Sequence, residues 1–304
     1  MAISASMVKE LREMTGAGMM DCKKVLVEAD GDMEKAVELL REKGLASAAK
    51  KAGRIASEGL VKLAFSADGK NAAAVEVNSE TDFVAKNEEF VEFVEVLSEI
   101  ALSVESDDVD AFMNADYRGE GNISDVLQAK IAKIGENMNV RRIAKCNTPG
   151  TVYVGYIHGA GKTGVIIGLE TEASAEEVAV VGRDVAMQVA SMNPQFVDES
   201  GVDPEFIEHE KKILIQQAIN EGKPADIVEK MVVGRLKKEL KETCLIEQKF
   251  VKNGEMSVKQ YVDSIGKEIG KSIRVAEMVR FEVGEGLEKK EENFAEEVAK
   301  QMGN

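Results

Sequence analysis

Histidine, cysteine and aromatic residues are scarce in this chain of 304 residues, with aromatics at only 5%. The two histidines, His158 and His209, lie in different segments, and Cys22, Cys146 and Cys244 are widely spaced without a CxxC pair. Because zinc sites need clustered Cys and His side chains, we expect no metal site, and nothing suggests a cofactor. No Cys or Ser has an obvious neighbouring base, which argues against covalent or metal-dependent enzyme chemistry.

Export signals and long apolar runs are also missing. The N-terminus has neither the apolar core of a signal peptide nor an Arg-rich presequence. Runs such as GVIIGL fall far short of the roughly 20 residues that span a bilayer. An odd number of cysteines in such a chain indicates reduced thiols. We therefore predict a cytoplasmic protein without a membrane partner.

Positive charge is in deficit, with 39 Lys and Arg against 55 Asp and Glu and a net charge of −16. Binding to a nucleic-acid backbone needs clustered Lys and Arg, so direct nucleic-acid binding is not expected. Residues 88–116 hold ten acidic and no basic residues. This pattern is typical of a solvated helix face and loop. The acidic connector 104–120 carries no clear motif.

The first 54 residues predict a three-helix bundle followed by a helical, Ala- and Lys-rich linker. A TGAG turn separates the first two helices, and Asp30–Gly31 ends the second. Asp32 is expected to cap the third helix and Gly44 to end it. Apolar residues recur at helical spacing at Met7, Val8, Leu11 and Met14, then at Met19, Met20, Val25, Leu26 and Ala29, then at Met33, Ala36, Val37 and Leu40.

The middle of the chain contains an internal repeat. Residues 59–103 and 150–192 share the order strand, polar turn, strand and amphipathic helix. The segments IGENMNVRRIAK (134–145) and IGKSIRVAEMVR (269–280) extend the similarity. Such self-similarity predicts an α+β fold with a duplicated core of two small antiparallel sheets, each with helices packed on it. In the first copy, Asn87 is expected to cap a helix that buries Phe90, Val94, Leu97 and Ala101.

The two copies differ in the connector between the second strand and the helix. The first has SETDFVAKN, with Phe83 among polar residues, and the second has TEASA. Because the second copy omits an aromatic, we predict that Phe83 is an exposed anchor for a partner. A partly buried loop aromatic is the alternative.

Two further helical segments follow within and after the second copy. The pattern predicts an antiparallel hairpin that protrudes as a coiled-coil arm. Its two helices are PEFIEHEKKILIQQAIN and PADIVEKMVVGRLKKEL, joined by EGKP. The pattern does not decide whether the arm self-associates. Its stripes are Ile207, Leu214 and Ala218, then Ile227, Met231 and Leu240. GEGLEKKEENFAEEVAKQ predicts a C-terminal helix whose weak stripe, Leu287, Phe294 and Val298, indicates docking on another surface.

The segment HGAGKTG suggests a phosphate-binding loop but does not match one. The motif G-x-x-x-x-G-K-[ST] requires a glycine at position 156, which is Tyr156, and it should open a helix. The residues that follow, VIIGLE, predict a strand. We therefore predict a hairpin turn rather than an NTPase site.

Other candidate contact groups lie outside these motifs. Met19 and Met20 point about 100° apart on a helix, so we expect one of them in the core and one exposed as an adaptable contact. Two lysine pairs, Lys23 with Lys24 and Lys50 with Lys51, are expected to be solvated. His158 is expected to be a structural residue before a turn.

Several motifs together resemble bacterial elongation factor Ts, and they occur in the same order over essentially the whole chain. They are TGAGMMDCKK, the Lys-Lys linker, ETDFVAKN, IGENMNVRR, the HGA turn and FEVGEG. The resemblance implies a non-enzymatic guanine-nucleotide exchange factor that binds elongation factor Tu, both GDP-bound and nucleotide-free. It implies a ubiquitin-associated-like (UBA-like) bundle in residues 1–54, a core at 55–148 and at 149–200 with 242–280, a coiled-coil hairpin at 201–241, and a C-terminal module at 281–304.

The resemblance also implies site residues. The connector residues Thr81, Asp82, Phe83 and Val84 would enter the partner's GTPase domain and disturb its magnesium and phosphate site. The bundle and the C-terminal helix would touch that domain, which points to Met19 and Met20, with Lys23 and Lys51 as further candidates. His158 would face another domain of the partner. Ser79 departs from the Cys common in the family. The alternative function is a non-catalytic adaptor that binds through residues 1–54.

Overall fold

A computed structural model describes residues 3–15, 17–222 and 224–288. The described residues form two compact units, the first within 1–62, 75–143 and 282–304 and the second within 63–74 and 144–281. Among these residues, no helix is long and apolar enough to cross a membrane. Cys22, Cys146 and Cys244 are buried free thiols.

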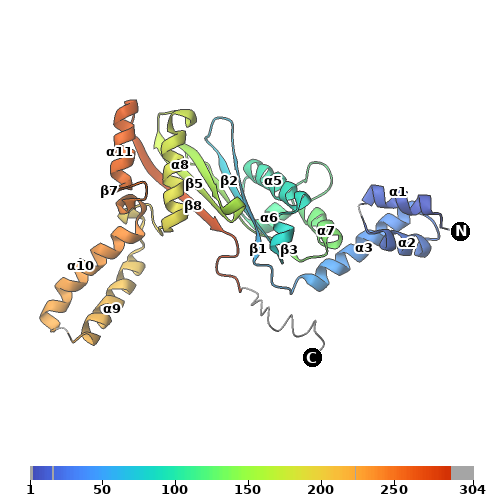
Figure 1. Ribbon diagram of the computed structural model, residues 1–304, viewed down its shortest axis with the longest axis horizontal. Helices are drawn as coiled ribbons and strands as arrows, with labels where there is room; N and C mark the ends of the chain where they lie inside the picture. The colour runs from blue at the N-terminus through green and yellow to red at the C-terminus, as the bar shows by residue number, and fades with distance from the viewer. Residues whose placement is uncertain (1–2, 16, 223, 289–304) are drawn as a thin grey trace. The chain divides into compact units, whose positions relative to one another are not determined.

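Three helices form the N-terminal bundle of the first unit (Figure 1): α1 (Ala5–Thr15), α2 (Met19–Glu28) and α3 (Met33–Lys51). Asp30 and Gly31 have positive φ angles of 51° and 85° and follow the end of α2, as predicted. The predicted cap is confirmed, because Asp32 Oδ1 accepts the Lys35 N–H at 3.1 Å. The buried core is Val8, Leu11, Cys22, Val25, Leu26, Ala29 and Ala36.

The prediction that Gly44 ends the third helix is wrong. Helix α3 continues through Gly44 to Lys51. A Cβ placed on Gly44 would lie 3.5 Å from the Cβ of Ala132 on α7 (Ile123–Ile134), so the glycine lies where two helices pack closely. The following Ala-rich sequence favours continued helix, and Ala48 is buried. Packing and propensity together therefore override the terminating tendency of glycine.

The first copy of the repeat forms a three-stranded sheet in the order β1-β2-β3, so the middle strand comes second in the chain. The predicted Asn87 cap and the buried residues Phe90, Val94, Leu97 and Ala101 are confirmed. The acidic connector is not wholly solvated, because Phe112 and Tyr117 are buried. The elements are β1 (Glu58–Phe65), β2 (Ala72–Ser79), α4 (Asp82–Ala85), α5 (Glu88–Ser103), α6 (Val109–Met113), α7 and β3 (Met138–Cys146).

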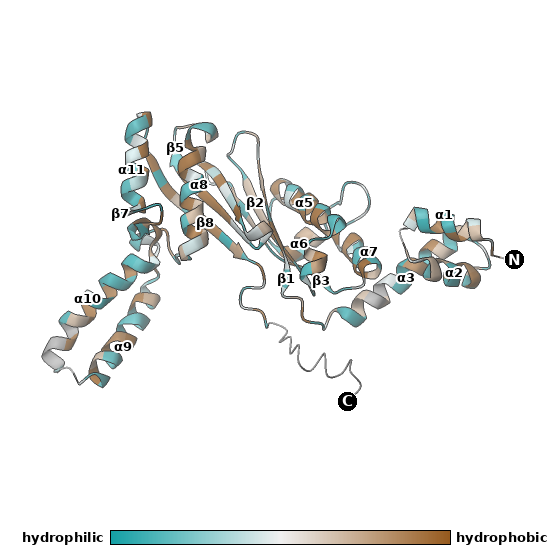
Figure 2. Cartoon of the chain, viewed as in Figure 1, coloured by the Kyte–Doolittle hydropathy of each residue, from teal (hydrophilic) through white to brown (hydrophobic). Residues whose placement is uncertain are grey.

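The second copy repeats this plan with the strand order β4-β5-β8. In both copies a helix that ends at a left-handed glycine, Gly135 or Gly270, leads into the third strand. The duplication predicted from the sequence is therefore confirmed. Figure 2 shows hydrophobic colouring on β5 and α8, which form much of this core. The elements are β4 (Thr151–His158), η1 (Gly159–Gly161), β5 (Thr163–Thr171), α8 (Ala175–Met192), α11 (Val258–Ile269) and β8 (Ile273–Glu282).

A helical hairpin is inserted in the second copy (Figure 1). Helix α9 (Pro204–Asn220) packs on α10 (Ala225–Thr243) through its own cluster, which contains the predicted Leu214 and Ala218. On α10 the buried residues are Val228, Val232 and Leu236, and the predicted Ile207 and Leu240 pack against the cluster. The predicted Met231 is half-buried and lies outside the cluster, and the side chain of Ile227 lies outside the described residues. The short elements around the hairpin are η2 (Glu199–Gly201), η3 (Leu245–Glu247), β6 (Lys249–Phe250) and β7 (Asn253–Ser257).

The last described segment follows β8. The C-terminal residues Phe294 and Val298 of the predicted terminal helix lie outside the described residues, whereas Leu287 lies inside them and is exposed.

Candidate partner-binding site

A one-turn helix, α4, carries the aromatic that interrupts the polar connector. Thr81 caps α4, with its Oγ1 accepting the Val84 N–H at 3.3 Å, and Asn87 caps the next helix. Val84 and Ala85 are buried, whereas the side chain of Phe83 is 81% exposed. The predicted exposure of Phe83 is confirmed, and the alternative of a partly buried loop aromatic is excluded.

The connector is braced from the corner between α7 and β3. Glu136 accepts the Thr81 N–H at 3.0 Å and the Thr81 hydroxyl at 2.7 Å. Beside it, Glu80 accepts the Asn137 N–H at 2.5 Å and pairs with Arg54 at 3.4 Å. Hydrogen bonds to charged groups are stronger than neutral ones. The backbone that presents Phe83 is thus held on both sides of Thr81.

Asp82 lies beside Phe83 on the same turn. Its Oδ2 is 2.5 Å from the Nζ of Lys86, four residues later, and both side chains are substantially exposed. Such exposed pairs contribute little to stability. The carboxylate therefore remains accessible next to the exposed ring.

A buried carboxylate anchors the sheet beneath the connector. Glu76 is fully buried and accepts bonds from Arg141 at 3.1 Å, Arg142 at 2.6 Å, Asn78 at 3.0 Å and the Gly284 N–H at 2.9 Å. Burial alone would raise the pKa of Glu76, but the bonds from Gly284, Asn78 and Arg142 outweigh it and lower that pKa.

Gly284 cannot be replaced easily in this arrangement. Its φ is 72°, and a Cβ there would lie 2.2 Å from the Ser57 carbonyl oxygen. This requirement gives a physical reason for the glycine in FEVGEG.

Both methionines at the start of α2 lie on the surface. Met19 is 55% and Met20 63% exposed, so the expectation that one of them is buried is wrong. The core face of α2 is filled instead by Cys22, Val25 and Leu26. Met14 of α1 is exposed as well, and exposed methionines are adaptable apolar contacts.

The lysines differ in exposure. Lys23, Lys24 and Lys50 are exposed as predicted, and Lys24 pairs with Asp21 at 3.5 Å. Lys51, at the end of α3, is half-buried rather than solvated.

His158 ends β4 in the second unit and is exposed. Its Nδ1 lies 2.9 Å from the Tyr156 hydroxyl. The GAGK segment that follows is a tight turn in which His158 pairs with Thr163 across the β4–β5 hairpin. The hairpin interpretation is confirmed, and the amides of this turn do not open a helix that could hold phosphate.

The structure places the predicted residues on separate elements: Thr81, Asp82, Phe83 and Val84 on or next to α4, Met19, Met20 and Lys23 on α2, Lys51 on α3, and His158 in the other unit. Among the described residues, no group of three or more His, Cys, Asp or Glu is placed to hold a metal. The sequence did not reveal the braces Glu136 and Glu80. Their only signal is position, directly after a helix-ending glycine and directly before the Thr cap.

Known proteins resemble this chain over nearly its whole length. A family model described as "Elongation factor TS" matches residues 80–285. "Elongation factor Ts" from Clostridioides difficile (strain 630) is 58% identical over 300 residues, covering 99% of each chain. The proteins of the same name from Clostridium novyi (strain NT) and Clostridium tetani (strain Massachusetts / E88) are 54% and 55% identical over 302 residues, again covering 99% of each chain.

Proposed function

The chain belongs to the elongation factor Ts family, and we propose that it is a guanine-nucleotide exchange factor that releases GDP from elongation factor Tu in the cytoplasm during translation. The observation that carries this proposal is the braced, 81% exposed ring of Phe83. Burying a Phe side chain is worth about 1.5–3 kcal/mol. A fold that forgoes this gain within the chain can recover it by inserting the ring into a partner.

Exchange requires no bond chemistry in this chain. If bound nucleotide weakens the partner's affinity for this chain, then the bound chain must weaken the partner's affinity for nucleotide by the same factor. We propose that Phe83 wedges between helices of the GTPase domain and shifts the groups that hold magnesium, whose charge helps to retain the phosphates. Asp82 would add repulsion toward phosphate or compete for a hydrogen bond at the magnesium site.

Other surfaces extend the proposed contact. The exposed Met19 and Met20, with Lys23 and Lys51, would bind the GTPase domain through the N-terminal bundle. His158, exposed at the end of β4, would contact a different domain of the partner. Val84 is buried, so its proposed role is to seat the turn that carries Phe83.

The test is the release of labelled GDP from elongation factor Tu. We expect Phe83→Ala to fold normally and to lose roughly 30- to 1,000-fold of the acceleration, since truncating a central anchor costs about 2–4 kcal/mol. Phe83→Leu should restore part of the rate because it keeps an apolar wedge.

Val180→Ala is the matched control, because Val180 is a similarly exposed apolar residue on α8. It should leave the release rate unchanged. An unaltered acceleration in Phe83→Ala would contradict the wedge, whereas no acceleration by the parent chain would favour the adaptor that binds through residues 1–54.

A further inference from the structure

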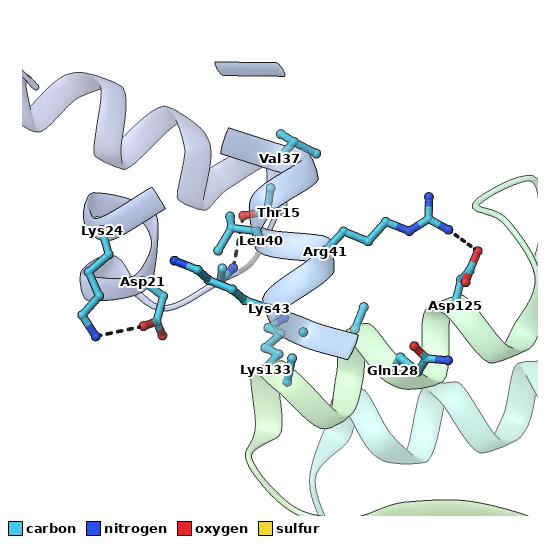
Figure 3. A pocket seen from close by; sticks show the side chains of 15 residues that line it. Thr15, Asp21, Lys24, Val37, Leu40, Arg41, Lys43, Asp125, Gln128 and Lys133 are labelled. Carbon is cyan, nitrogen blue, oxygen red and sulfur yellow. Dashed lines mark hydrogen bonds and ion pairs between the residues drawn. The ribbon is translucent and has the colours of Figure 1, made fainter. Parts of the chain in front are cut away.

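A cleft of about 390 Å³ lies within the first unit, between α3 and α7 (Figure 3), but its charges are already neutralised. Each of the four lysine and arginine side chains that line it has a carboxylate partner within the described residues. The pairs are Lys24 with Asp21, Arg41 with Asp125, Lys43 with Glu28 and Lys133 with Glu89. The cleft therefore presents no unpaired lining cation to a ligand.

Asn253 of β7, in contrast, has a reactive side chain that the fold leaves accessible. It is the only asparagine of the chain that is followed by glycine. The amide nitrogen of the next residue can attack an asparagine carboxamide, and glycine obstructs this attack least because it has no Cβ. Asn253 and Gly254 are both exposed. A Cβ placed on Gly254 would meet no atom within 4 Å, so no neighbouring group shields this peptide bond.

The backbone around Asn253 is loosely paired. Strand β6 has only two residues, and Phe250 lies opposite Asn253 whereas Lys249 lies opposite Ser257. Residues 254–256 therefore have no opposite residue on β6, as in a bulge. A two-stranded hairpin is only marginally stable by itself. Local opening of such a hairpin lets the Asn253–Gly254 peptide reach the bent geometry that the attack requires.

The carboxamide of Asn253 is oriented by one local bond. Its Oδ1 accepts the Glu255 N–H at 3.1 Å. This bond closes a ring that contains both Cγ of Asn253 and the nitrogen of Gly254, and it leaves the side chain beside the backbone. Among the described residues, none accepts a hydrogen bond from Nδ2 of Asn253. The amino group that deamidation removes is therefore not held in place.

Asn78 of β2 shows the opposite situation. It precedes another small residue, Ser79, but it is only 1% exposed and lies on the central strand of its sheet. Its Nδ2 donates to the Glu58 carbonyl oxygen at 3.1 Å and to Glu76 Oε1 at 3.0 Å. Because the carboxamide and the backbone are both fixed, Asn78 should remain intact.

We propose that Asn253 is a site of spontaneous deamidation. A base removes the Gly254 amide proton, and the nitrogen attacks Cγ of Asn253. The N–Cγ bond forms, the Cγ–Nδ2 bond breaks, and ammonia leaves a cyclic succinimide. Water then opens the ring at Cγ, which gives aspartate, or at the main-chain carbonyl carbon, which gives isoaspartate. This chemistry goes beyond nucleotide exchange and does not depend on it.

Deamidation changes the contacts of β6 and β7 with α8. Either product places a new carboxylate next to Lys252, whose Nζ lies 2.5 Å from Asp184 Oδ1. Asp184 also accepts the Tyr261 hydroxyl at 2.8 Å. The new charge competes for Lys252. Isoaspartate also lengthens the backbone by a methylene, which disturbs the alternation of side chains along β7.

The test is incubation of the full-length chain at mildly alkaline pH, followed by peptide mass spectrometry and measurement of released ammonia. The Asn253 peptide should show the mass of a carboxyl in place of a carboxamide, with an equivalent amount of ammonia. A protein-isoaspartate methyltransferase should label the same peptide. The rate should rise with pH, because the attacking nitrogen must lose its proton. The Asn78 peptide is the internal control and should stay unchanged.

Gly254→Ala is the matched variant, because the position has room for a methyl group and its φ is not in the left-handed region. It should slow deamidation by about tenfold or more, since a Cβ hinders the attack and narrows the backbone conformations. Equal rates in the parent chain and Gly254→Ala, or an unmodified Asn253 peptide, would overturn the proposal. A product without isoaspartate would also overturn it by indicating direct hydrolysis, and this readout holds even if Gly254→Ala alters the melting temperature.

Discussion

The two copies of the repeat solve the same structural problem with different connectors. In the second, Ser174 and Glu177 form a capping box directly at the start of α8. In the first, the chain inserts α4 between two caps and projects Phe83 into solvent. Since the second copy completes its strand-to-helix connection without this turn, the extra turn and its exposed ring are additions that the scaffold does not need.

The copies also differ at one internal pair of positions. Aligning VEVNSET with IGLETEA matches Glu76 to Gly168, and aligning IGENMNVRR with IGKSIRVAE matches Arg142 to Glu277. The first copy therefore buries an ion pair, Glu76–Arg142. In the second, Gly168 admits the Tyr153 ring, and Glu277 accepts the Tyr153 hydroxyl at 2.8 Å.

Removing the two glutamates should give the largest difference in stability between the copies. Glu76→Ala leaves Arg142 and the Gly284 N–H without their buried acceptor and should cost about 3–5 kcal/mol. Glu277→Ala should cost about 1–2 kcal/mol, because the Tyr153 hydroxyl still accepts the Thr148 N–H. Urea denaturation of both variants measures the difference, and equal losses would contradict the distinction.

The contribution of the Glu76 carboxylate to stability should also appear in the pH dependence of unfolding. The pKa of Glu76 is lowered in the folded state, so its contribution is complete above its unfolded pKa, about 4.3, and is lost as the pH falls through the folded pKa. The free energy of unfolding should therefore fall less steeply below about pH 4.3 in Glu76→Gln than in the parent chain. The exposed Glu10→Gln is the control and should follow the parent; parallel curves for Glu76→Gln would refute the assignment.

Local sequence signals predicted much of the fold. The caps Asp32 and Asn87, the buried face of α5 and the duplicated strand order depend on neighbours within one or two turns, or on the repeat. The bonds of Glu76 and the brace of Thr81 depend on residues far away in the sequence. Glu76 accepts a hydrogen bond from Gly284, 208 residues away, and Thr81 donates to Glu136, 55 residues away. The prediction that Gly44 ends a helix was wrong because the role of this glycine depends on its packing against α7. The prediction that Met19 or Met20 is buried was wrong because Cys22 takes the core position.

The braces of the two connectors offer a sharper comparison. Glu136 and Lys271 each follow the left-handed glycine of their copy, but Glu136 holds Thr81, whereas Lys271 pairs with Glu177 at 2.8 Å. Glu136→Ala should lower stability by about 1–3 kcal/mol and slow GDP release, because Phe83 is then less firmly presented. Lys271→Ala should leave release unchanged. Comparable slowing in both would show that the brace acts only through global stability.

The smallest effect should come from the charge beside the ring. Thr81 caps α4, so Asp82→Asn should keep the turn and change stability by at most about 1 kcal/mol. If Asp82 acts by repelling phosphate, this variant should slow GDP release by only a few-fold, and the difference should shrink as salt screens the charge. The Phe83→Ala defect arises from an apolar wedge and should persist in salt. A salt-independent defect in Asp82→Asn would instead assign the carboxylate a direct hydrogen bond in the partner, so the ionic-strength series separates the two contributions of one turn.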